Sequence, residues 1–193
     1  MLIQMLINQP QMLLPIVQRT PLWVWGLLAA LTWLGLSQAR NRTASLTRVA
    51  FMPVAMTALS VWGTVSAFGN SPQFGSVLLA WLAAAALSLA ATAPMAAPAG
   101  ARYDARARLF SLPGSWVPMA LILGIFLIKY VVGVDLAMQP GFARDARYAL
   151  VTAALYGLFS GIFIGRAARL WRLARRPASA GGTPPAQRLS LRA

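Results

Sequence analysis

Five apolar runs of about 20 residues recur along this chain, and they restrict its fold more than any other feature. A helix of about 20 apolar residues spans the roughly 30 Å hydrocarbon core of a bilayer. Hydrophobic residues make up 59% of the chain, and its three acidic residues are too few for the surface of a soluble domain of this size. No segment shows the period-two alternation of a transmembrane barrel strand. We therefore expect an all-α, polytopic integral membrane protein with five transmembrane helices.

The composition divides the chain into three parts. Residues 1–19 are apolar but interrupted by Gln, Asn and Pro, which predicts an amphipathic helix in the membrane interface rather than a span or a signal peptide. Residues 20–170 form the predicted membrane domain. Residues 171–193 are basic and rich in Pro, Gly, Ser and Ala, which predicts a mostly disordered cytoplasmic tail. The predicted spans cover approximately residues 21–39, 49–69, 73–93, 115–137 and 146–168.

Arginine is unevenly distributed among the predicted loops. Three arginines follow the first span, three follow the third and five lie within residues 166–176, whereas the turn after the second span has none. Positive residues are retained on the cytoplasmic side, so we expect a periplasmic N-terminus and a cytoplasmic C-terminus. The preference for Arg over Lys and the abundance of Ala fit a bacterial inner membrane protein from a GC-rich genome. The net charge of +14 then reflects topology and not nucleic-acid binding.

Lys129 is the only lysine in the chain, and it lies inside the fourth predicted span. A charge at this depth is costly, and a charge that persists there is a candidate functional group. The lysine either has a structural role, paired inside the bundle or snorkelling to the headgroups, or it binds or moves an anion or a proton. Asp135 lies six positions further on, off the Lys129 face of the helix. The candidate intramembrane functional residues are Lys129, Tyr130, Asp135, Ser60, Thr64 and Ser160.

The fifth predicted span has a small residue at every fourth position, and the third has a similar face. Small residues allow helix backbones to approach closely in lipid. The face serves either contact between spans of one chain or self-association of two chains through Gly157 and Gly161. The predicted helix-packing residues are Ala149, Ala153, Gly157, Gly161 and Gly165.

Five arginines follow the fifth span at close spacing. Residues 165–176 are predicted to extend the helix, with their leucines and tryptophan facing lipid and their arginines at the headgroups. We therefore expect these arginines to bind anionic lipid headgroups. They are Arg166, Arg169, Arg172, Arg175 and Arg176.

Little in the chain points to catalysis. It contains no Cys and no His, which excludes disulfides, thiol chemistry and nearly every zinc site. It has no carboxylate pair for acid–base chemistry and no nucleotide-binding loop. A Ser–Lys dyad needs Ser60 or Ser160 to pack against Lys129. We expect no catalytic residue, no metal site and no cofactor.

Several motifs are familiar in combination. They are Thr20–Trp25 (TPLWVW), Leu112–Pro118 (LPGSWVP), Lys129–Tyr130 and Tyr156–Gly161 (YGLFSG). With these motifs, residues 20–171 resemble a family of bacterial inner-membrane proteins of unknown function, whereas the stretch before Thr20 takes no part. The resemblance implies the class and location of the protein and carries no activity.

The sequence therefore favours a non-enzymatic packing or accessory component of the inner membrane that can self-associate. Its expected partners are the lipid bilayer, anionic headgroups and a second copy of the chain, without nucleic acid. The alternative is a small transporter or channel subunit that uses Lys129. A substrate cavity should be lined by several polar spans, and only the second predicted span is markedly polar.

Overall fold

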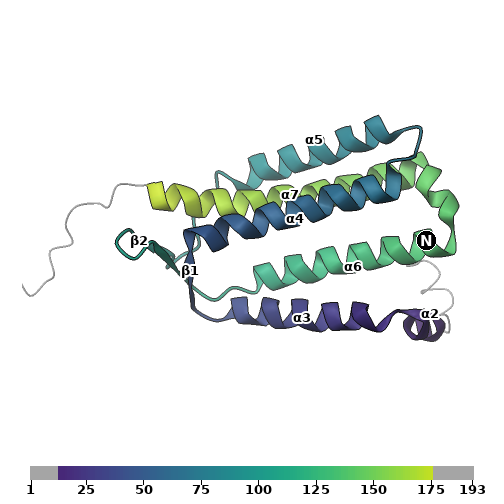
Figure 1. Ribbon diagram of the computed structural model, residues 1–193. Helices are drawn as coiled ribbons and strands as arrows, with labels where there is room; N and C mark the ends of the chain where they lie inside the picture. Colours follow the sequence, from purple (N-terminus) through teal and green to yellow (C-terminus); the bar gives the residue numbers. More distant parts are fainter. Residues whose placement is uncertain (1–12, 176–193) are drawn as a thin grey trace, which may run out of the picture.

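The computed structural model describes residues 13–175 of the chain (Figure 1). The helices are α2 (Leu13–Arg19), α3 (Leu22–Ala39), α4 (Leu46–Phe68), α5 (Phe74–Thr92), α6 (Val117–Met138), the short 3₁₀ helix η2 (Pro140–Arg144) and α7 (Ala146–Arg175). The strands are β1 (Arg42–Ser45), β2 (Arg102–Asp104) and β3 (Leu109–Leu112). Most of the predicted interfacial helix and most of the predicted tail lie outside the described residues.

Five helices of the described part, α3 to α7, are long and apolar enough to cross a membrane. Each of them corresponds to one predicted span. Helix α7 is the longest, with 30 residues, or about 45 Å at 1.5 Å per residue. Its last turns therefore extend beyond the hydrocarbon thickness of a bilayer, and they carry the arginines that follow the fifth predicted span.

The helices form two groups that lie one above the other in Figure 1. In one group, α5 packs closely along α7, and α4 packs on α7 as well. Phe68, Val77, Trp81, Ala153 and Tyr156 are central to the buried core of this group. In the other group, α3 packs along α6, and contacts between α6 and α7 are few. The two groups are therefore held together over only part of their length.

Local sequence sets where several helices begin. The Ser45 hydroxyl accepts a hydrogen bond from the Arg48 backbone N–H at 3.3 Å at the start of α4. The Asp145 carboxylate accepts one from the Tyr148 N–H at 2.7 Å at the start of α7. Side chains of this kind satisfy backbone donors that have no partner within the helix. Helix α6 begins next to Pro118, where a missing N–H is tolerated.

The all-α prediction is wrong in one respect, because the segments expected to be loops form a small antiparallel sheet of strand order β1-β3-β2. Arg42 pairs with Leu112, and Tyr103 pairs with Phe110. Phe110 is fully buried, and the sheet packs against Leu170 and Ala174 of α7. Strands β2 and β3 are close in sequence and form a hairpin, whereas β1 pairs with a strand that is far away in sequence.

The sheet and the C-terminal end of α7 lie together at one end of the bundle, opposite α2 (Figure 1). We call this end the arginine-rich end. Its described arginines are Arg40, Arg42, Arg48, Arg102, Arg106, Arg108, Arg166, Arg169, Arg172 and Arg175. The arrangement agrees with spans that alternate in direction, because the first and third interhelical connections meet the end of the fifth span.

Candidate functional site

Lys129 lies inside the helical bundle, where α6 faces α4 and α7. Its ammonium nitrogen donates a hydrogen bond to the Leu59 carbonyl oxygen at 3.3 Å, and it lies 4.7 Å from the centre of the Tyr156 ring. A methyl group added at Gly63 would collide with this nitrogen, so the glycine leaves the space that the ammonium occupies. An ammonium over an aromatic face is attracted by the ring quadrupole. The lysine is therefore held by a backbone carbonyl and an aromatic ring.

A groove of about 1130 Å³ surrounds this lysine, between the α3/α6 group and the α4/α7 pair. Its walls are largely apolar and aromatic, with Trp23, Trp62 and Phe126 among the lining residues. Trp23 and Trp62 are each 69% exposed, so the groove is open along its rim. Two cations, Lys129 and Arg19, line it, and no acidic residue does within the described part of the chain. We call this space the Lys129 groove.

A buried hydrogen-bond network forms the wall behind the lysine. The Ser60 hydroxyl accepts from the Trp81 indole N–H at 2.9 Å and donates to the Tyr156 carbonyl at 3.2 Å. The Ser160 hydroxyl donates to the same carbonyl at 2.8 Å. Neither serine is hydrogen-bonded to Lys129 in the described structure. The Ser60 hydroxyl therefore joins α4 to α5 and α7, whereas the Ser160 hydroxyl bonds within α7. Neither forms the Ser–Lys pair that nucleophilic catalysis needs.

The other predicted candidates lie around the groove at different distances from its centre. Tyr130 lines it and forms a 2.7 Å hydrogen bond with the Thr20 hydroxyl, which links α6 to the segment between α2 and α3. Thr64 is buried in α4, donates to the Ser60 carbonyl at 3.0 Å and does not line the groove. Asp135 is buried near the end of α6 and accepts from the Tyr148 hydroxyl at 3.2 Å. The structure therefore brings Ser60, Ser160 and Tyr130 to the groove of Lys129, but neither Thr64 nor Asp135.

The predicted packing residues of α7 face α5 of the same chain. A Cβ at Gly157 would collide with the Trp81 carbonyl oxygen, one at Gly161 with the Ala85 carbonyl and one at Gly165 with the Thr92 hydroxyl. Ala149 and Ala153 are fully buried in the same core. Contact within one chain therefore occupies the glycine face on which the self-association alternative depended.

The predicted headgroup arginines have different surroundings. Arg166 is half-buried and lines a second pocket, described below. Arg172 donates to the backbone carbonyls of Ala93 and Met95, and Arg175 is exposed beside the Trp171 ring. Arg176 lies outside the described residues. Binding of these arginines to headgroups stays a prediction.

Sequence reasoning did not place Tyr156, Gly63 and the Leu59 carbonyl at the site. The face of the Tyr156 ring is what contacts the lysine. A glycine three positions after Ser60 on a predicted span was the available signal, because a residue without a side chain leaves room for a neighbour. Within residues 13–175 no cluster of three His, Cys, Asp or Glu side chains could hold a metal ion, and the absence of a cofactor stays a prediction.

Comparison with known proteins identifies one family. A family model described as a family of unknown function (DUF6622) matches residues 1–181. No curated protein and no solved structure matches the chain. The predicted likeness to a family of unknown function is confirmed, but the exclusion of the stretch before Thr20 is wrong, because the match begins at residue 1. The chain belongs to this family of unknown function, DUF6622.

Proposed function

We propose that this chain is a non-enzymatic, multi-pass protein of the bacterial inner membrane that binds an anionic amphiphile in the Lys129 groove. Its N-terminus is periplasmic and its C-terminus cytoplasmic in this proposal, which follows from the distribution of arginine. The many large apolar side chains exposed on α3, α4 and α5 support contact with lipid. Self-association stays a prediction, and it would have to use a face other than the glycine face of α7.

The proposal rests on one observation. Lys129 is a cation in a mostly apolar groove that no carboxylate of the described residues lines. The ammonium of a lysine has three hydrogen-bond donors. In the described structure Lys129 has one hydrogen bond, to the Leu59 carbonyl, and one ring contact, with Tyr156. Buried charges are stable when they are paired and hydrogen-bonded. An anionic group on a ligand would supply the partner that the surrounding residues do not.

The shape and lining of the groove indicate the rest of the ligand. Pockets for small molecules commonly have volumes of about 300–1,000 Å³ and a few polar groups in an apolar wall. The Lys129 groove is slightly larger than this range, at about 1130 Å³, and is mostly apolar. A water-filled ion path would need polar residues from several helices. A long-chain amphiphile with an anionic head fits the groove better than an inorganic ion does.

The test compares three amphiphiles with the same alkyl chain: a fatty carboxylate, a fatty alcohol and an alkyl trimethylammonium. Each is added to the purified protein in a neutral maltoside detergent, and thermal unfolding is followed. We expect the carboxylate to raise Tm most in the native protein and to lose this advantage in Lys129→Met. Arg147→Met, which removes an exposed cation of α7 outside the groove, is the matched control. An unchanged carboxylate preference in Lys129→Met would contradict the proposal.

Transport of the same amphiphile between leaflets is the second candidate function. The groove extends from Arg19 and Met138 to Met56 and Phe163, and the last two residues also line the pocket at the arginine-rich end. A path along most of the bundle is what movement of a lipid-like molecule requires. Reconstituted vesicles with a fluorescent fatty acid in one leaflet distinguish transport from binding alone, because only transport accelerates its appearance in the other leaflet.

A further inference from the structure

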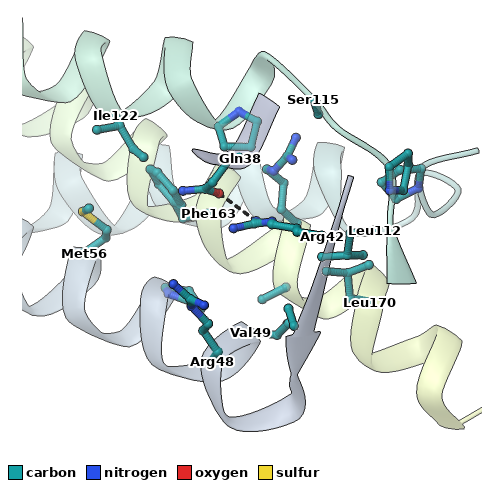
Figure 2. Close-up of a pocket in the computed structure, with 17 residues that line it drawn as sticks. Gln38, Arg42, Arg48, Val49, Met56, Leu112, Ser115, Ile122, Phe163 and Leu170 are labelled. Atoms are coloured by element: carbon teal, nitrogen blue, oxygen red, sulfur yellow. Dashed lines mark hydrogen bonds between the residues drawn. The ribbon is translucent and has the colours of Figure 1, made fainter. Parts of the chain in front are cut away.

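A second pocket lies at the arginine-rich end, where β1, α4 and α7 meet. Its volume is about 120 Å³, and the arginines that line it are Arg42, Arg48 and Arg166. Figure 2 shows Arg42 and Arg48 extending into the same space from neighbouring elements. One buried water needs about 10–15 Å³ of free volume. The pocket therefore has room for a group of the size of a phosphate together with water.

Arg42 is held in place before any ligand binds. Its guanidinium donates to the Gln38 side-chain oxygen at 2.8 Å, and this glutamine is only 6% exposed. The Gln38 backbone carbonyl in turn accepts from the Ser115 N–H at 3.1 Å. The backbone of Arg42 pairs with Leu112 in the sheet. A side chain fixed in this way loses little freedom on binding, which is how a preformed site gains affinity.

The three arginines have no carboxylate close to them. The chain has three acidic residues, and none of them lines the pocket. Asp104 accepts backbone N–H groups in the turn between β2 and β3, and Asp145 caps the start of α7 at the opposite end of the bundle. Asp135 contacts Tyr148 at that opposite end too. Burial and the nearby charge of Arg48 lower the pKa of the Arg42 guanidinium.

We infer that Arg42, Arg48 and Arg166 bind a phosphoryl group in this pocket. A guanidinium presents its N–H groups as a planar fork that matches the oxygens of a phosphate. Three such groups around one small space can neutralise a doubly charged phosphate, which relieves their mutual repulsion. The Lys129 groove is a different site with a single lysine at its centre, so this inference does not depend on the proposed function.

The phosphoryl group has two chemical sources, a phospholipid headgroup or a soluble phosphate. Met56, Ile122 and Phe163 line both this pocket and the Lys129 groove. An apolar chain attached to a bound phosphate therefore has a continuous path along the protein. This contiguity favours a phosphate carried on a lipid.

The test uses two probes with the full-length protein. In the first arm, isothermal titration measures inorganic phosphate binding in a neutral detergent, with ionic strength held constant by chloride. In the second arm, native mass spectrometry measures retention of phosphatidic acid in competition with phosphatidylcholine. Arg48→Gln is the main variant, because Arg48 is exposed and its loss should not prevent folding. Arg42→Gln is the second variant, and thermal unfolding without ligand establishes that both fold.

Arg106→Gln is the matched control, because Arg106 is an exposed arginine in the β2–β3 turn at the same end and outside the pocket. We expect Arg42→Gln and Arg48→Gln each to weaken binding by about tenfold or more, as loss of a charge-assisted hydrogen bond does. Arg106→Gln should change binding by less than about twofold, because Arg106 does not line the pocket. If Arg42→Gln and Arg48→Gln weaken only the retention of phosphatidic acid, the site binds a lipid headgroup. If they weaken the binding of inorganic phosphate, the site binds a soluble phosphate. Equal affinity of all the variants for both probes, or an equal loss in Arg106→Gln, would overturn the inference.

Discussion

Replacing Gly157 by Ala is the sharpest test of how α5 and α7 are packed. The added Cβ would collide with the Trp81 carbonyl oxygen, which belongs to the backbone of α5 and cannot rotate away. Overpacking of this kind lowers the free energy of unfolding by about 1–3 kcal/mol. The better helix propensity of Ala offsets up to about 1 kcal/mol of this loss. Because the obstacle is backbone, we take the upper half of the range and expect a net loss of about 1–2 kcal/mol.

Gly26→Ala is the matched control, because a Cβ at Gly26 meets nothing within 4 Å. It should gain about 0.5–1 kcal/mol from helix propensity alone. The two variants should therefore differ by about 2–3 kcal/mol, which corresponds to roughly 4–12 °C in Tm for a chain of this size. Thermal unfolding in detergent, followed by circular dichroism, measures the difference. A Gly157→Ala protein as stable as Gly26→Ala would refute the close contact of α5 with α7.

Four further predictions concern Lys129, Trp81, Asp145 and the topology of the chain. Lys129→Met should leave Tm within about 1–2 °C of the native value or raise it, because replacing an ion in an apolar site by an apolar group is often neutral or stabilising. A large fall in Tm would show that the lysine is structural. Trp81→Phe should lower the free energy of unfolding by about 1 kcal/mol in chemical denaturation, because it removes the indole N–H that donates a hydrogen bond to Ser60. Trp33→Phe, at an exposed position, should lower it much less. Asp145→Ala should cost about 1 kcal/mol and Asp145→Ser much less, because serine can also cap the Tyr148 N–H. A reporter active only in the periplasm should be silent after Ala193 and active after Asn70, and the reverse result would contradict the proposed topology.

The positions of the five long helices followed from sequence because each apolar run is long enough to satisfy its own backbone hydrogen bonds as a helix. A helix does this without any partner, so length and hydropathy are sufficient to predict it. The sheet could not be predicted in the same way. Arg42 pairs with Leu112 across a long stretch of chain, and neither short segment has enough alternation to indicate a strand by itself. Pairing between such segments depends on how the helices bring them together.

Only part of the candidate site could be predicted from the sequence, because its contacts also depend on how the helices pack. Lys129 was identifiable from its charge and depth alone. Which groups surround it depends on the rotation of each helix about its axis, and the weak periodicity of uniformly apolar spans leaves that rotation undetermined. Sequence therefore indicated polar side chains such as Ser60 and Ser160 as candidates, whereas the structure places the Leu59 carbonyl and the Tyr156 ring at the ammonium. The three arginines of the second pocket come from β1, α4 and α7, and only the folded chain brings them together.

The Lys129 groove and the arginine pocket have one electrostatic property in common. Each contains cations that no carboxylate of the described residues balances, whereas Asp104 and Asp145 hold backbone N–H groups in a turn and at a helix start. A cation in a low-dielectric wall and a cluster of like charges both raise the free energy of the folded state until an anion binds. Any anion that binds only the folded protein stabilises it in proportion to the logarithm of its concentration. The fold of this chain should therefore be more stable in a membrane that supplies anionic amphiphiles than in a neutral detergent.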